Sequence, residues 1–224
     1  MSPQDLLRLH PFFSALPPTD IDKLLMRTRR RCVLAGKVLF EKNAPGDGLY
    51  GVLSGRIGFT VESADGKELT LNVLGSGEFF GEIALLDGKG RSAAATARDA
   101  SELLFIPRQE FLSFVRERPD VMLHIMAVVC ARLRRSTEYI ADAAFLDLAK
   151  RLAKQLVVLL NGHGTSPETA LRISHAELAS MLGASRERVS RLLAAWADKG
   201  ILDQGRGRLV VRDPRALEQL VGDG

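Results

Sequence analysis

The stretch between residues 81 and 95 reads GEIALLDGKGRSAAA and combines residue types that can bind a phosphorylated sugar. Its arginine, Arg91, follows a glycine-rich turn and precedes Ser92 and a run of alanines, which let phosphate oxygens approach the backbone. Backbone N–H groups in a turn, together with an arginine, form a receptor for phosphate. Glu82, nine residues earlier, can accept a hydrogen bond from a ribose hydroxyl. The spacing alone is also typical of a surface arginine.

A second set of polar residues follows the pattern of a helix-turn-helix near the C-terminus. Ser174 and Glu177 form an S-x-x-E capping box, Gly183 suits the turn, and Ser185 can cap the next helix. That helix buries Val189, Leu192, Leu193 and Trp196, which leaves polar side chains on the outer side of its first turns, where a recognition helix contacts base edges. Arginine pairs with guanine and a carboxylate accepts from cytosine. An R-E-R run is also common on a solvated helix face.

A hairpin wing is predicted to follow this helix pair. Ile201–Asp203 and Arg208–Arg212 have strand character and are joined through Gln204–Gly207. Arginines on a wing suit phosphate contacts, which position a protein on DNA without reading its sequence. The predicted DNA-contacting residues are Ser174, Ser185, Arg186, Glu187, Arg188, Ser190, Arg191, Arg206 and Arg208.

The segment from Arg31 to Pro107 indicates a small antiparallel β domain. Short apolar runs alternate with glycine turns, and Asp65-Gly66 between alternating strands is typical of a hairpin. Many short strands with regular turns predict a barrel or sandwich. Two segments upstream have helical spacing.

One long helix is predicted over residues 109–144, where glycine is absent. Apolar residues recur on it at alternating steps of four and three, which favours a partner helix from a second subunit over simple packing on the β domain. The stripe consists of Met122, Met126, Val129, Leu133, Ser136, Ile140 and Ala143. Asp147 is a plausible N-cap for the next helix, so a domain boundary is placed near residues 141–147.

Composition narrows the class of protein. With 46% hydrophobic and 26% charged residues the chain is globular, and the absence of a long apolar run or a signal-peptide pattern predicts a cytoplasmic protein without a membrane partner. Cys32 and Cys130 are far apart in the chain and make no CxxC pair, so a cysteine-ligated metal cluster is not expected. No paired metal ligands and no nucleophile beside a base are seen, so an enzyme and a catalytic residue are not predicted.

FGEIALLDGKGRSAA resembles the phosphate-binding cassette of cyclic-nucleotide-binding domains. With the helix-turn-helix downstream, the chain resembles bacterial transcription regulators of the cyclic AMP receptor protein/FNR family over nearly its whole length. The resemblance implies an α+β fold: a cyclic-nucleotide-binding jelly-roll β-barrel with flanking helices (residues 1–108), a long dimerisation helix (109–144) and a winged helix-turn-helix DNA-binding domain (147–224).

The resemblance also implies roles for individual residues. Arg91 and Ser92 would bind the cyclic phosphate, Glu82 the ribose 2′-hydroxyl, and Ser136 and Thr137 the base. The Ser-Thr order is swapped relative to the cyclic AMP receptor protein, and the loop before Arg91 is one residue shorter. The predicted nucleotide-contacting residues are Gly81, Glu82, Ile83, Ala84, Arg91, Ser92, Ala93, Ser136 and Thr137.

The predicted function is therefore a homodimeric transcription regulator that binds cyclic AMP and a palindromic DNA site. The run S-R-E-R-V-S-R implies half-sites like TGTGA on double-stranded DNA, and the family admits RNA polymerase as a further partner. Cyclic GMP is an alternative ligand, because a serine after the arginine can contact a syn guanine. A constitutive DNA-binding dimer with a vestigial nucleotide site is the other alternative. The four histidines lie outside the predicted barrel, which disfavours haem, and two cysteines cannot supply four iron–sulfur ligands.

Overall fold

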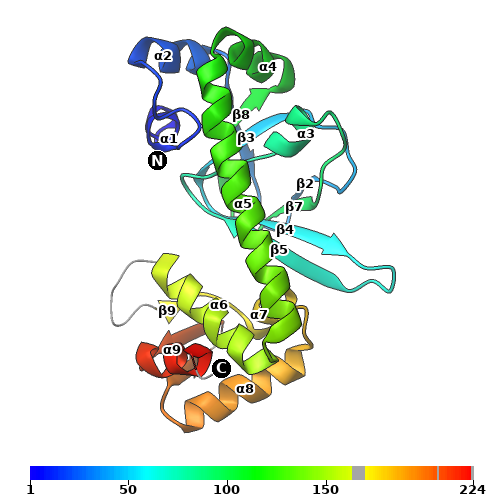
Figure 1. The fold of residues 1–224 in the computed structure, drawn as a ribbon, viewed down its shortest axis with the longest axis vertical. Helices are drawn as coiled ribbons and strands as arrows, with labels where there is room; N and C mark the ends of the chain where they lie inside the picture. Colours follow the sequence, from blue (N-terminus) through cyan, green and yellow to red (C-terminus); the bar gives the residue numbers. More distant parts are fainter. Residues whose placement is uncertain (163–169, 206, 223–224) are drawn as a thin grey trace. The chain divides into compact units, whose positions relative to one another are not determined.

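The computed structural model describes residues 1–162, 170–205 and 207–222. The chain divides into two compact units, each with its own core (Figure 1). The first unit comprises residues 1–63 and 71–134, and the second comprises residues 64–70 and those from 135 onwards. The predicted α+β class is confirmed, and no described helix is long and apolar enough to cross a membrane.

The β domain consists of two four-stranded antiparallel sheets, with strand orders β1-β8-β3-β6 and β2-β7-β4-β5. The jelly-roll prediction is confirmed, but the two sheets are not joined into the closed barrel that was expected. Bulges interrupt the pairing within β2 and β3, which bends these strands. The strands are β1 Arg29–Val33, β2 Val38–Phe40, β3 Gly48–Ser54, β4 Ile57–Glu62, β5 Glu68–Leu74, β6 Phe79–Phe80, β7 Ala94–Ala97 and β8 Ser101–Pro107.

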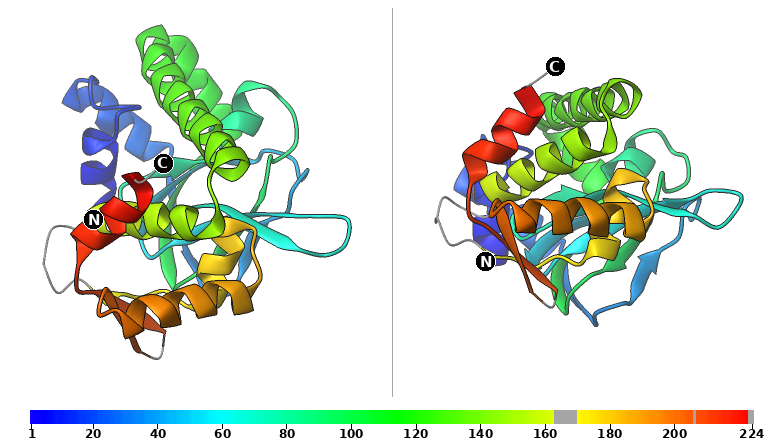
Figure 2. Two further views of the ribbon diagram at one scale, coloured as in Figure 1. Left: turned by 60° about the horizontal axis from the view of Figure 1, so that its bottom comes forward. Right: turned by 90° about the horizontal axis from the view of Figure 1, so that it is seen from below.

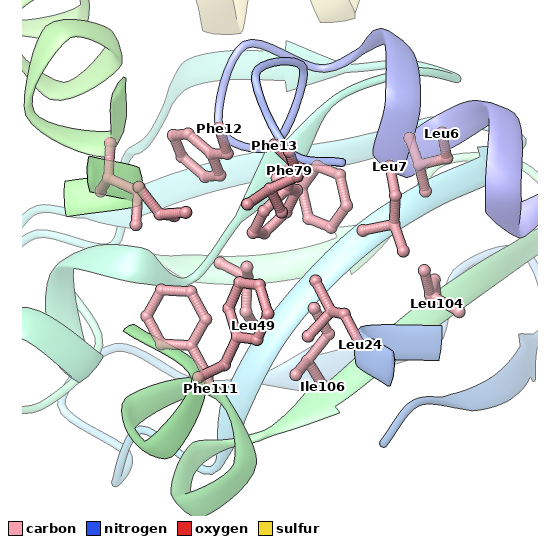
Figure 3. Close-up of a cluster of buried hydrophobic side chains, with 14 of the residues drawn as sticks. Leu6, Leu7, Phe12, Phe13, Leu24, Leu49, Phe79, Leu104, Ile106 and Phe111 are labelled. Carbon is pink, nitrogen blue, oxygen red and sulfur yellow. The ribbon is translucent and has the colours of Figure 1, made fainter. Parts of the chain in front are cut away.

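The sheet built on β3 and β8 is buried on both of its faces. On β8, Leu103 and Phe105 join a core between the two sheets, whereas Leu104 and Ile106 join a second core under the helices. This alternation follows from the two-residue period of a strand. Figure 3 shows the second core, in which Phe79 and side chains from the N-terminal helices pack against the sheet. These two cores fix the strands that carry the site described below.

Besides one short helix in the site, three helices lie wholly in the first unit, and a fourth continues from it into the second unit after residue 134. Helices α1 (Pro3–Leu9) and α2 (Pro18–Met26) precede the sheets, and α4 (Arg108–Glu117) and α5 (Pro119–Phe145) follow them. The predicted long helix is confirmed as α5, but it begins at Pro119 and not at residue 109, since the chain breaks between α4 and α5 at Arg118, whose φ of −132° and ψ of 76° are not helical. Proline disfavours helical geometry in the residue before it and suits the first turn of the helix that follows.

His10 links the N-terminal segment to the second core and makes the stability of this unit depend on pH. Its side chain is 8% exposed, packs edge-on against Phe12 and Phe79, and accepts a hydrogen bond from the Phe12 N–H at Nδ1 (3.1 Å). Burial first, and then the nearby charge of Arg132, lower the pKa of His10 from 6.5 to about 4. The native state therefore holds the neutral imidazole down to mildly acidic pH.

We expect the free energy of unfolding to fall as the pH drops from about 6.5 to about 4, by about 3 kcal/mol. In that window the unfolded chain binds a proton at His10 and the native chain does not, so acid favours unfolding. Urea denaturation at a series of pH values measures this slope. In His10→Asn, whose side chain keeps an acceptor for the Phe12 N–H, the His10 part of the slope should vanish; an unchanged slope would contradict the assignment.

The second unit is a three-stranded sheet covered by helices. Helices α6 (Leu148–Gly162) and α9 (Pro214–Gly222) pack against each other (Figure 2). The sheet has the order β10-β11-β9, formed by Leu202–Gly205, Arg208–Val211 and Ala170–Leu171. The predicted N-cap of α6 is confirmed, because Asp147 Oδ1 accepts from the Lys150 N–H (2.9 Å). The predicted hairpin wing is confirmed as β10 and β11.

Candidate functional site

The turn that opens the 81–95 segment, hereafter the cassette, requires glycine. Gly81 has a φ of 92°, a left-handed conformation, and precedes the short helix α3 (Glu82–Leu86). A Cβ at this position would lie 2.4 Å from Arg91 Nη1 and 3.1 Å from the Gly48 carbonyl oxygen. Glycine is therefore needed both for the backbone conformation and for the close approach of the arginine.

Arg91 is buried, with 2% of its surface exposed, and its guanidinium is held by several protein groups. Nη1 donates to the Gly81 carbonyl (2.9 Å), and Nη2 donates to the Gly48 carbonyl (2.9 Å) and to Asp47 Oδ1 (2.5 Å). The guanidinium carbon also lies 4.2 Å from the centroid of the Phe40 ring. A charge this deeply buried needs such partners, so Arg91 has a structural role in addition to any ligand contact.

Asp47 connects Arg91 to a second cation. Its Oδ2 accepts from the Tyr50 hydroxyl (2.7 Å), which in turn accepts from Arg31 Nη1 (3.0 Å). Burial, and next the hydrogen bond to Asp47, raise the pKa of Tyr50 above its usual value. Tyr50 therefore remains a neutral donor to Asp47 at physiological pH.

Glu82 is the second buried charged residue of the cassette. Its side chain is 1% exposed, and Oε1 accepts from Arg132 Nη1 (2.5 Å) on α5. Arg132 also donates to the carbonyl of Phe79, the residue that begins β6. One arginine of α5 thus fixes both the Glu82 carboxylate and the strand that leads into the cassette.

Both charged residues of the cassette keep one buried atom without a hydrogen-bond partner. Among the described residues only three buried side-chain atoms lack a partner: Arg91 Nε, Glu82 Oε2 and Arg151 Nε. Buried polar atoms are nearly always satisfied, so such atoms mark positions where a ligand or water belongs. The pair here is an N–H donor and a carboxylate acceptor, which complement a phosphate oxygen and a sugar hydroxyl.

The other predicted nucleotide residues are distributed around these two. In the cassette, Ala84 and Ala93 are buried, whereas Ile83 and Ser92 are exposed. The Ala84 carbonyl accepts from Arg108 Nη1 (2.9 Å), which ties α3 to the start of α4. Ser136 and Thr137 are exposed on α5, four and five residues beyond Arg132. The structure thus brings the cassette residues together, and contact of Ser136 and Thr137 with a ligand stays a prediction.

Sequence reasoning missed Asp47 and Arg132, the two side chains that pair with the cassette charges. Asp47 lies in a Pro-Gly-Asp-Gly sequence at the start of β3, and no local pattern relates it to Arg91, since the contact arises from the pairing of β3 with its neighbours. Arg132 did carry a signal. It lies one helical turn before Ser136, so the two side chains share a face of α5.

The helix pair in the second unit has the predicted caps. Ser174 caps α7 (His175–Leu182): its Oγ accepts from the Glu177 N–H (3.2 Å), while the Glu177 carboxylate accepts from the Ser174 N–H (2.8 Å). Gly183 ends α7 with a φ of 58°. Ser185 caps α8 (Arg186–Asp198) by accepting from the Arg188 N–H (3.4 Å). The hydroxyls of both serines are therefore engaged in capping.

The first turns of α8 present charged side chains to solvent. Arg186, Glu187, Arg188 and Arg191 are exposed, and Val189, Leu193 and Trp196 are buried below them. Hydrogen bonding to its own backbone N–H at the helix start, and next to Ser185, lowers the pKa of Glu187, which keeps an acceptor carboxylate available. This face offers donors and an acceptor for base edges.

Three further residues were predicted to contact DNA: Ser190, Arg206 and Arg208. Ser190 is half-buried and its Oγ lies 2.8 Å from His175 Nδ1, so this hydroxyl joins α8 to α7. Arg208 begins β11 and is exposed, as a phosphate contact requires. Arg206 lies outside the described residues. Elsewhere in the described chain, no group of three metal-ligating side chains is found, and Cys32 and Cys130 are exposed thiols.

Two family models match this architecture. The cyclic nucleotide-binding domain matches residues 30–118, and the Crp-like helix-turn-helix domain matches residues 150–220. The first match contains the cassette and the second contains α7 and α8. The protein is thus a DNA-binding transcription regulator with a cyclic-nucleotide-binding domain.

Similarity to individual proteins extends over most of the chain. A cyclic AMP receptor protein from Thermus thermophilus is 37% identical over 94% of this chain and 96% of its own length. A CRP-like cAMP-activated global transcriptional regulator from Mycobacterium tuberculosis is 32% identical over 88% of this chain and 89% of its own. The chain therefore belongs to the cyclic AMP receptor protein/FNR family.

A solved structure supports the same assignment. The c-di-GMP responsive global regulator CLP from Xanthomonas campestris superposes with a TM-score of 0.78 at 28% identity, over 87% of this chain and 99% of that one. The relatives found are transcription regulators. Their names differ in the nucleotide: cyclic AMP in the first two and c-di-GMP in the third.

Proposed function

We propose that the protein is a homodimeric transcription regulator that responds to cyclic AMP and binds a palindromic DNA site with TGTGA-like half-sites. The observation that carries the nucleotide part is the pair of unsatisfied buried atoms, Arg91 Nε and Glu82 Oε2. They belong to a segment that matches a cyclic nucleotide-binding model, and two relatives above 30% identity are named for cyclic AMP.

The Arg91 guanidinium that would bind the phosphate already forms an ion pair with a carboxylate in the free protein. Asp47 neutralises Arg91 before the ligand arrives, and 48% of the Asp47 side chain is exposed. The phosphate takes the open Nε donor and competes with Asp47 for the guanidinium, and water solvates the released carboxylate. Glu82, fixed through Oε1 by Arg132, offers Oε2 to the ribose 2′-hydroxyl. Both steps leave every buried polar atom of the cassette satisfied.

Ser136 and Thr137 supply hydroxyls for the base, as the family resemblance implies. Hydroxyls both donate and accept, so they serve adenine or guanine. Ser92 is exposed next to the phosphate-binding arginine, which is the position from which a guanine amino group would be contacted. Cyclic GMP therefore remains the second candidate ligand, and cyclic AMP is favoured by the names of the Thermus thermophilus and Mycobacterium tuberculosis relatives.

Titration calorimetry of the purified protein with cyclic AMP, cyclic GMP and cyclic di-GMP tests the ligand. We expect micromolar binding of cyclic AMP and weaker binding of the other two. Tighter binding of cyclic GMP would move the proposal to that ligand. No binding of any of the three would leave the constitutive dimer with a vestigial site as the better account.

Dimerisation is supported by the exposed apolar residues of α5. In the single chain Met126, Leu133 and Ile140 are 53%, 66% and 67% exposed, whereas Met122 and Val129 pack on the core of the first unit. The stripe predicted from the sequence thus divides between the protein's own core and a face that a second α5 can cover.

We expect Leu133→Glu to convert the dimer to a monomer at micromolar concentration, because a carboxylate in a helix seam loses its hydration. Sedimentation velocity measures the change. Ala141→Glu is the matched control, since it adds the same charge to an exposed site of α5 outside the stripe. Equal sedimentation of Leu133→Glu and the wild type would place the dimer interface elsewhere or show that none exists.

A further inference from the structure

A cavity of about 560 Å³ lies in the first unit at the edge of the two sheets where β1 and β2 run. Its wall includes Arg31 and Cys32 of β1, Leu34 and Lys37 of the connecting turn, and Val38 of β2. No residue of the cassette lines it. The volume is in the range of small-molecule sites, which is roughly 300–1,000 Å³.

Apolar side chains at the mouth of this cavity are unusually exposed. Leu34 is 79% and Val38 is 40% exposed, although both flank an apolar interior that includes Leu39 and Leu103. The turn between β1 and β2 holds Leu34 there, because the Leu34 carbonyl accepts from the Lys37 N–H (3.1 Å). An apolar ligand in the cavity would remove these side chains from water.

Two cations stand beside this apolar surface. The Arg31 guanidinium is stacked on the Phe105 ring (3.5 Å to the centroid) and donates to the Tyr50 hydroxyl, while its distance to Asp47 Oδ2 is 3.6 Å. Guanidinium has five N–H donors, so others are available to a ligand. Lys37 is exposed and forms no ion pair with any described residue.

We propose that this cavity is a second ligand site, separate from the cassette, and that it binds an apolar carboxylate such as a medium-chain fatty acid or an aryl acid. The hydrocarbon part lies against Leu34, Val38 and Leu103, and the carboxylate pairs with Lys37 and Arg31. A neutral apolar molecule fits the walls but leaves both cations without a ligand partner. The site therefore prefers a carboxylic acid over the alcohol of the same hydrocarbon chain.

The two cysteines provide the test, because Cys32 lines the cavity and Cys130 lies on α5. Both thiols are exposed in the single chain, and the alkylation rate of each by iodoacetamide is measured by mass spectrometry in the same sample, with and without the probe. Decanoate is the probe and decanol is its neutral control. At about ten times the dissociation constant, decanoate should slow alkylation of Cys32 roughly tenfold and leave the rate at Cys130 unchanged. Decanol should protect Cys32 much less.

Variants and a competitor make the result specific. Lys37→Gln, on an exposed turn, should weaken the protection by decanoate roughly tenfold, and Arg31→Gln should do the same. Lys42→Gln removes an exposed cation outside the cavity and should change nothing. The proposal is overturned by equal protection of both cysteines, by equal protection from decanol, or by an unchanged Lys37→Gln. It is also overturned if cyclic AMP displaces decanoate, since the acid would then occupy the nucleotide site.

Discussion

Arg91→Leu is expected to reduce the affinity for cyclic AMP by at least about 100-fold, because it removes a charge-assisted donor set that the small residues around it cannot replace. In the proposed complex the phosphate uses the open Nε and the Nη2 group that Asp47 holds in the free protein. Calorimetry gives the loss directly. The variant is also expected to be less stable, since the carbonyls of Gly48 and Gly81 lose their donor.

The stability effect has to be separated from the binding effect. Lys89→Leu is the matched control, because Lys89 is an exposed cation in the same loop and its loss removes the same charge. Arg91→Lys keeps the charge but not the planar set of donors. Relative to Arg91→Leu, it should therefore restore the stability of the fold more fully than the affinity for cyclic AMP. Circular dichroism establishes which variants are folded at the titration temperature. A folded Arg91→Leu protein with wild-type affinity would remove Arg91 from the phosphate site.

The second large effect is expected on the recognition helix. Arg186→Ala should weaken binding of the dimer to a palindromic TGTGA duplex by about 30-fold or more, because one bidentate contact to guanine is worth about 1–3 kcal/mol and the variant loses it in both half-sites. Glu187→Ala should weaken binding less and should relax the preference for the base pair that it reads. Fluorescence anisotropy with a labelled duplex measures both affinities.

The same titrations on a duplex of unrelated sequence distinguish the loss of a base contact from the loss of a phosphate contact. Affinity for that duplex should change little in Arg186→Ala, since phosphate contacts supply non-specific binding. Arg215→Ala is the matched control, because Arg215 is an exposed arginine of the same unit on α9. Equal losses on both duplexes would show that Arg186 contacts phosphate and does not read bases.

Local chemistry explains which parts of the structure could be predicted from the sequence. The caps at Asp147, Ser174 and Ser185 each depend on residues within three positions, and all three are confirmed. Gly183 likewise ends α7 as predicted. The break before α5 is local too: Pro119 is visible in the sequence, yet the absence of glycine over residues 109–144 favoured one continuous helix.

The contacts that complete the site were not predictable in this way. Asp47 and Arg91 are 44 residues apart, and Glu82 and Arg132 are 50 apart, so each pair depends on how the strands and α5 pack. Whether the sheets close into a barrel depends equally on long-range pairing, which no single segment specifies. Ser190 was expected to face DNA, but its hydroxyl lies next to His175.

Gating of DNA binding by cyclic AMP requires the ligand to favour the DNA-competent state differentially. The most direct test is the affinity of the full chain for a labelled palindromic TGTGA duplex, measured by anisotropy with and without saturating cyclic AMP at fixed salt. We predict that cyclic AMP tightens binding by about 5- to 150-fold, the usual range of allosteric coupling. Equal affinity in both titrations would contradict the claim and would identify a constitutive DNA-binding protein.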